Sequence, residues 1–137
     1  MTEPVMHRNE SDYPWELDPD DAHRAARIRV RTFVSGGRTE TSGLSMGVFE
    51  MPPGAALDPH SHHPQEVYYV TAGEAEIYLD GAWRPLRAGD VLYVPGDTVH
   101  GARNRGSAPC TIVWAFPTDS YDEIEYFPAG EGRATAG

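Results

Sequence analysis

Apolar and polar residues alternate along much of the chain between residues 27 and 116. In the segment RIRVRTFV, every second residue from Ile28 to Val34 falls on one face, because successive side chains of a strand point to opposite sides. Similar short segments follow at 44–51, 66–70, 74–79, 90–95, 99–104 and 110–116. Small turn sequences separate them, and Asp80-Gly81 indicates a hairpin because both residues tolerate positive φ. Short strands joined by small turns predict an all-β, antiparallel sandwich or barrel.

The two ends of the chain carry less regular patterns. Residues 1–26 are expected to be irregular, with one short helix that has Asp18 as N-cap and Pro19 as its first residue. Residues 27–117 are expected to form the β domain. Residues 118–137 are expected to form an acidic extension, in which YDEIEYF packs on the domain or exchanges with a neighbouring copy and the last residues are disordered.

Composition and charge narrow the classes of function. A chain of 137 residues suits one domain with a sizeable core, and no apolar run approaches the roughly 20 residues of a membrane helix. The net charge of −10 argues against nucleic acid and anionic membranes as partners. All eleven basic residues are arginine, which excludes a lysine Schiff base. The single Cys110 and the polar N-terminus indicate a soluble, cytoplasmic protein.

The stretch HSHHPQE, residues 60–66, concentrates three of the six histidines beside a glutamate. On a strand, His60 and His62 point to the same side and can converge on one ion, whereas His63 points away. Pro64 then breaks the strand, so that Glu66 on the next strand is a natural third ligand. His100, in a later β segment, is a candidate for the fourth. Histidines with an ordinary surface or core role remain the alternative on spacing alone.

Glycines and prolines frame these ligands in a distinctive way. Residues 54–73 read G-x5-H-x-H-x3-E-x6-G, and residues 89–104 read G-x5-P-x4-H-x3-N. This pair of motifs, separated by fifteen residues, closely resembles the cupin superfamily. The one departure is Asp97, which stands where a glycine is expected, while Gly96 comes one place earlier.

The resemblance implies a single-domain antiparallel cupin β-barrel, a jelly roll, over residues 27–117. It further implies that His60, His62, Glu66 and His100 bind one divalent transition metal ion, for which iron, manganese, nickel, cobalt, copper and zinc are all suitable. The glycines of the motifs and Pro95 are turn residues, and Asn104 matches a position that is more often structural than catalytic. An octahedral ion with these four ligands would keep two positions open for a substrate.

Residues that share the parity of the ligands are expected to line the pocket. Tyr68 shares the face of Glu66, so these two are the candidate catalytic residues, with a barrel-filling role as the alternative for Tyr68. Further candidates for the substrate pocket are Met46, Ile77, Ala102, Trp114 and Phe116. Parity does not decide which face of 110–116 points inward. His7 and His23 are expected to be solvated.

Three functions are consistent with these residues. The first is a metal-dependent enzyme that stabilises an enolate or alkoxide of a small oxygen-bearing molecule, an oxygenase if the metal is redox-active. The second is non-redox chemistry, as in lyases, isomerases and polyketide cyclases. The third is a module that binds or senses a small ligand without turnover. A homodimer is expected, because pairing would cover exposed strand edges.

Overall fold

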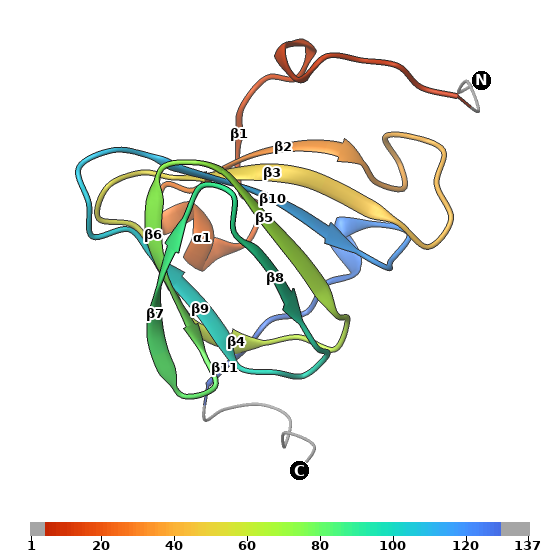
Figure 1. Ribbon diagram of the computed structural model, residues 1–137. Coiled ribbons are helices and arrows are strands. Elements are labelled where there is room, and N and C mark those ends of the chain that lie inside the picture. The colour runs from red at the N-terminus through yellow and green to blue at the C-terminus, as the bar shows by residue number, and fades with distance from the viewer. Residues whose placement is uncertain (1–4, 130–137) are drawn as a thin grey trace.

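The computed structural model describes residues 5–129 as two antiparallel sheets that face each other (Figure 1). The first sheet has the strand order β1-β2-β3-β10-β5-β8. Its strands are Glu16–Leu17 (β1), Arg29–Val34 (β2), Ser45–Met51 (β3), Cys110–Phe116 (β10), Glu66–Ala72 (β5) and Val91–Val94 (β8). The second sheet has the order β11-β4-β9-β6-β7. Its strands are Phe127–Pro128 (β11), Ala56–Ser61 (β4), His100–Arg103 (β9), Glu74–Leu79 (β6) and Ala82–Arg87 (β7).

The hydrophobic core lies between the two sheets. Alternate residues of β10, from Cys110 to Phe116, are almost fully buried, and they pack against inward-facing residues of β3 and β5 such as Phe49 and Val70. Ile77 on β6 belongs to the same core from the opposite sheet. This period-2 burial is what the alternating sequence predicts for strands with one buried face, and it confirms the all-β jelly-roll class.

All seven predicted strands are present, and the hairpin turn is confirmed. Asp80 and Gly81 have φ values of 54° and 79° and connect β6 to β7. The sequence pattern had not indicated β7 as a strand, because it has few inward apolar residues and contains Pro85. The second sheet ends with β7, where a proline is tolerated because one side of an edge strand needs no backbone donor.

The expected helix is present, but its predicted cap is wrong. Helix α1 spans Asp21–Ala25, and its N-cap is Asp20, whose carboxylate accepts the backbone N–H groups of Ala22 and His23. Asp18 is turned toward the interior and is only 3% exposed. The turn Glu10–Asp12 (η1) precedes β1, and the turn Tyr121–Glu123 (η2) precedes β11.

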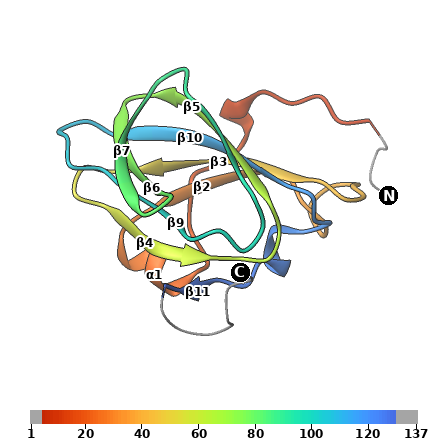
Figure 2. The same cartoon turned by 60° about the horizontal axis from the view of Figure 1, so that its bottom comes forward.

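Helix α1 and the C-terminal segment that contains β11 pack on the same part of the barrel. Figure 2 shows α1 and β11 lying side by side next to β4. The C-terminal segment reaches this position after Asp119, whose backbone oxygen accepts the N–H of Gly36. The expected disorder of the last residues concerns positions 130–137, outside the described range. Within residues 5–129 no helix is long and apolar enough to cross a membrane.

Candidate metal centre

Four side chains from both sheets meet in the barrel interior at the positions that the motifs indicate. His60 on β4 and His100 at the start of β9 are direct partners in the strand register. His62 follows the end of β4, and Glu66 begins β5 in the facing sheet. All four are buried, with exposed fractions of 7%, 1%, 1% and 4% for His60, His62, His100 and Glu66. The structure thus brings together residues that lie up to forty positions apart.

The donor atoms of these residues lie close enough to share one ion. One nitrogen from each of His60, His62 and His100 falls within 4.8 Å of the others. Glu66 Oε1 lies 3.1 Å from His62 Nε2 and 3.5 Å from His100 Nε2. Two ligand atoms bound at right angles to one ion, each about 2.1 Å away, are about 3 Å apart. The spacing between the carboxylate and the two imidazoles therefore suits adjacent positions around one metal.

Backbone carbonyls fix the orientation of all three imidazoles. In each ring, Nδ1 lies 2.8 Å from a backbone carbonyl oxygen. The partner of His60 is Asp58, that of His62 is Pro64 and that of His100 is Thr98. A carbonyl oxygen only accepts, so Nδ1 must carry the hydrogen in each ring. In the neutral imidazoles Nε2 then offers a lone pair, which is the arrangement that histidine ligands of metals adopt.

A cation could balance the lone pairs that converge in this buried space. The lone pair of His62 Nε2 faces Glu66 Oε1 at 3.1 Å, and among residues 5–129 the buried Nε2 of His100 has no hydrogen-bond partner. An unpaired buried polar atom costs free energy, and a metal ion would satisfy it together with its neighbours. The donor set, three imidazoles and one carboxylate, therefore fits a divalent transition metal.

The electrostatics of the site favour metal-ready protonation states. Burial, assisted by the neighbouring His100, lowers the pKa of His60 from 6.5 to about 3, so this ring is neutral at physiological pH. Burial opposes ionisation of Glu66, but the imidazoles of His100 and His62 outweigh it and hold the pKa of its carboxyl below the usual value. Both groups are thus in the deprotonated form that coordinates metals.

A small cavity adjoins two of the four candidate ligands, His60 and Glu66. Tyr68 and Trp114, both predicted for the pocket, line it together with Phe49 and the side chains of His60 and Glu66. Burial and the charge of Glu66 raise the pKa of the Tyr68 phenol well above its usual value, so Tyr68 carries a proton that it can donate. The inward face of 110–116 is therefore the one that contains Trp114.

The other predicted pocket residues lie farther from the cavity. Phe116 packs edge-on against His62, with ring centroids 5.3 Å apart. Ile77 and Ala102 are buried in the core but do not line the cavity. Met46 neither lines the cavity nor belongs to the buried core. It alternates on β3 with Gly47, which faces inward against the ring of Trp114. The structure does not bring Met46 to the site.

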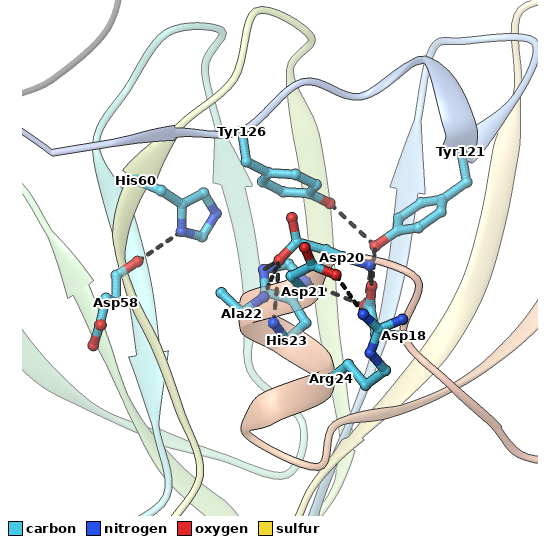
Figure 3. A network of polar contacts seen from close by, with 10 residues as sticks. All are labelled: Asp18, Asp20, Asp21, Ala22, His23, Arg24, Asp58, His60, Tyr121 and Tyr126. Atoms are coloured by element: carbon cyan, nitrogen blue, oxygen red, sulfur yellow. Dashed lines mark hydrogen bonds and ion pairs between the residues drawn. The ribbon is translucent and has the colours of Figure 1, made fainter.

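Four lining residues come from the chain ends and were missed by the sequence reasoning. His23, expected to be solvated, is only 7% exposed, and its Nδ1 lies 3.1 Å from Asp18 Oδ2. Tyr121 donates to the same carboxylate oxygen at 3.1 Å, and Tyr126 donates to the Tyr121 hydroxyl at 3.2 Å (Figure 3). The ring of Tyr126 stacks edge-on near His60, with centroids 5.3 Å apart. Aromatic and acidic residues in an irregular segment gave no local signal of this convergence.

The remaining histidines and two further motif residues, Asp97 and Asn104, have roles away from the candidate ligands. His7 is exposed, and the side chain of His63 is 76% exposed beside Asp97. Asp97 adopts a φ of 62°, so it takes the left-handed conformation expected of the missing glycine. Asn104 donates to the carbonyls of Met51 and Ala108 and accepts the N–H of Gly106. These bonds hold backbone and give Asn104 a structural role.

A jelly-roll barrel with three inward imidazoles and a carboxylate on facing strands defines the cupin class of protein. The chain matches the family profile described as "Cupin domain" over residues 47–116, which includes all four candidate ligands. The protein belongs to the cupin family.

Similar proteins include enzymes of more than one kind. The chain is 34% identical over 99 residues to "Dimethylsulfoniopropionate lyase DddW" of Ruegeria pomeroyi, an alignment that covers 72% of this chain and 64% of that protein. It is 40% identical over 100 residues to "Polyketide synthase CurC" of Streptomyces cyaneus, covering 72% and 63%. The structure of the polyketide cyclase RemF from Streptomyces resistomycificus shares the fold, with a TM-score of 0.80, 16% identity and coverage of 94% and 88%. The chain thus spans less than two thirds of the length of these two curated relatives.

Proposed function

We propose that the protein is a metal-dependent cupin enzyme that moves a proton to or from a small oxygen-bearing organic molecule, as lyases and cyclases do. The observation that carries this proposal is the convergence of three carbonyl-anchored imidazoles and Glu66 next to a cavity lined by hydroxyl groups. Oxygenase chemistry remains the alternative if the bound metal is redox-active.

His60, His62, His100 and Glu66 would hold the ion. When bound, a divalent metal supplies Lewis-acid stabilisation for negative charge that develops on a substrate oxygen. The carbonyls of Asp58, Pro64 and Thr98 keep each imidazole in the required tautomer, so no reorganisation is needed when the metal binds. The burial of all four residues excludes bulk water and strengthens their electrostatic interactions.

Glu66 and Tyr68 are the proposed catalytic residues. Tyr68 follows Glu66 by two positions on β5, so both side chains face the cavity from the same strand. In this arrangement the Tyr68 hydroxyl donates to an oxygen of the substrate, and the Glu66 carboxylate accepts a proton from an adjacent carbon. Neither step needs a cationic side chain, and of the described residues no arginine lines the cavity.

The relatives support this class of reaction over others. The two curated proteins are named for a lyase and a polyketide synthase, and the structural neighbour for a polyketide cyclase. Dimethylsulfoniopropionate is therefore the first substrate to test. Elimination of its carbon-bound proton together with the carbon–sulfur bond would release dimethyl sulfide and acrylate, which balances atoms and charge without an oxidant.

Metal binding is tested first, with protein purified without a histidine tag. We expect near-stoichiometric metal by elemental analysis in the wild type and its loss in His60→Ala and His100→Ala. His63→Ala is the matched control, since it removes a histidine from the same stretch whose side chain is exposed. Full metal content in either ligand variant would refute that ligand.

Turnover is tested next on the metal-loaded protein. Dimethyl sulfide is measured by gas chromatography and acrylate by NMR, and aromatic polyketones are assayed for cyclisation by mass spectrometry. Equal rates with and without oxygen support proton transfer, whereas a rate that depends on oxygen supports the oxygenase alternative. We expect Tyr68→Phe to lower the rate about 100-fold or more, the range for removal of one general acid. An unchanged rate would exclude Tyr68 from catalysis.

A further inference from the structure

The cavity beside the metal centre is too small for any organic substrate. It has room for about one water molecule. Of the residues that line it, only Tyr121 and Tyr126 are partly exposed, and the others are buried. A substrate can therefore reach the candidate ligands only if part of the surrounding wall moves, and the tyrosine pair is the part that faces solvent.

The wall has two parts that differ in how firmly they are attached. Strands β5 and β10 pair with each other through a ladder from Val67 to Ala72, and β10 also pairs along its whole length with β3. The C-terminal segment 118–129 has only a two-residue ladder with β4, at Phe127 and Pro128. Its other backbone attachments are single bonds, from Ala129 to the Pro59 carbonyl, from Gly36 to the Asp119 carbonyl and from Tyr121 to Ser35 Oγ. Segments with few ladder hydrogen bonds open at low free-energy cost, whereas long central ladders open only with the whole domain.

Side-chain hydrogen bonds hold the C-terminal segment against the N-terminal one. The Asp18 carboxylate accepts from the backbone N–H of Asp20 and from the Tyr121 hydroxyl, and it lies against His23 Nδ1. Tyr126 joins through the Tyr121 hydroxyl (Figure 3). A carboxylate makes stronger hydrogen bonds as an acceptor than a neutral group does. Within residues 5–129, Asp18 thus links the N-terminal segment to both tyrosines through hydrogen bonds.

We propose that Tyr121 and Tyr126 form the door of the substrate pocket, and that Asp18 is the positioning residue that holds this door closed. The door is the whole segment 118–129, which carries both tyrosines, and in the open state this segment moves away from β4 and α1. In the closed state the ring of Tyr126 lies over His60 and His62, with centroid distances of 5.3 and 5.6 Å. The proposal rests on the proposed function in one respect, that the substrate binds at this pocket.

Hydrogen exchange measured by mass spectrometry tests the door in the metal-free protein. We expect Asp18→Asn and Tyr121→Phe to speed exchange in peptides of segment 118–129 by about tenfold or more, because each removes a bond to a charged group. Peptides of β3, β5 and β10 should exchange as in the wild type. Glu76→Gln is the matched control, since it weakens a carboxylate pair with Arg103 between β6 and β9 and should leave segment 118–129 unchanged. Faster exchange in the barrel strands as well would overturn the proposal, because Asp18 would then hold the fold and not a door.

A reversible cross-link tests whether the door controls access. Ser35 Oγ and Ser120 Oγ are 3.3 Å apart, so Ser35→Cys with Ser120→Cys can form a disulfide next to Tyr121. The reduced form of the same protein is its own control. Oxidation should slow exchange in segment 118–129 and should slow the removal of Zn²⁺ by EDTA about tenfold or more, and a reductant should restore both rates.

The two measurements separate the door from the metal site. Equal rates of Zn²⁺ removal in the oxidised and reduced forms would overturn the door as the route to the metal. If the protein binds neither Zn²⁺ nor another divalent transition metal, the proposed function fails, while the exchange rates of segment 118–129 still decide whether Asp18 holds a movable wall.

Discussion

Asn104 offers the sharpest test of the distinction between structural and catalytic residues in this site. Its side chain is 1% exposed and makes three hydrogen bonds within the protein. Nδ2 donates to the carbonyls of Met51 and Ala108 at 3.0 and 2.8 Å, and Oδ1 accepts the N–H of Gly106 at 3.0 Å. These bonds join the ends of β3 and β9 to the loop that precedes β10.

The cost of Asn104→Ala follows from these contacts. Each intramolecular hydrogen bond contributes about 1 kcal/mol, and a buried partner left unpaired raises the loss to between about 1 and 3 kcal/mol. Water can reach part of the loop, so we expect a decrease of about 3–5 kcal/mol in the free energy of unfolding. For a domain of this size that corresponds to a fall of about 10–15 °C in Tm. Urea unfolding followed by circular dichroism measures the change.

Asn104→Asp sharpens the test because it keeps the shape of the side chain. The substitution places a carboxylate oxygen where Nδ2 now faces two carbonyl oxygens, so repulsion replaces both donated bonds. At neutral pH this variant should be at least as unstable as Asn104→Ala, and below the melting transition both should bind metal like the wild type. A wild-type Tm for Asn104→Asp, or loss of metal from the folded variants, would refute the structural role.

Three further predictions follow from other parts of the fold. Burial raises the pKa of the Cys110 thiol from 9.0 to about 11. The free energy of unfolding should therefore fall by up to about 3 kcal/mol as pH rises from about 9 to 11. An equally steep dependence of stability on pH in Cys110→Ala would contradict this, as would rapid labelling of the native thiol at pH 8. In Gly47→Ala, the new Cβ would lie 2.6 Å from Cζ2 of Trp114 and closer still to the carbonyl oxygen of Arg31. We expect the free energy of unfolding to fall by about 2–3 kcal/mol and the tryptophan fluorescence to change. Unchanged fluorescence and stability would count against this packing. The outer face of β5 and β8 exposes a cross-strand apolar cluster of Val67, Tyr69, Val91 and Tyr93. We expect this face to join two copies in a homodimer that Tyr69→Glu dissociates, and sedimentation of the wild type as a monomer at micromolar concentration would exclude it.

The sequence by itself determined seven of the strands and the candidate ligands. Period-2 alternation and turn residues such as Asp80-Gly81 act over a few positions, and they located seven strands and one hairpin. The i, i+2 spacing of His60 and His62, and the glycines that frame them, indicated which side chains would converge. These rules did not predict β7, which is an edge strand and contains a proline. A strand that pairs on one side alone leaves little pattern in the sequence.

The tertiary structure alone decided what surrounds those ligands. Local rules made Asp18 a helix cap, but its carboxylate is bound by Tyr121, which is 103 positions away in the chain. His23 was expected in solvent for the same reason, since its burial depends on β4 and on Tyr126. Contacts between the two chain ends arise only when the barrel brings both to one face, and no spacing within either end records that. The candidate metal centre is therefore indicated by short-range patterns, whereas the wall that encloses it is a product of packing.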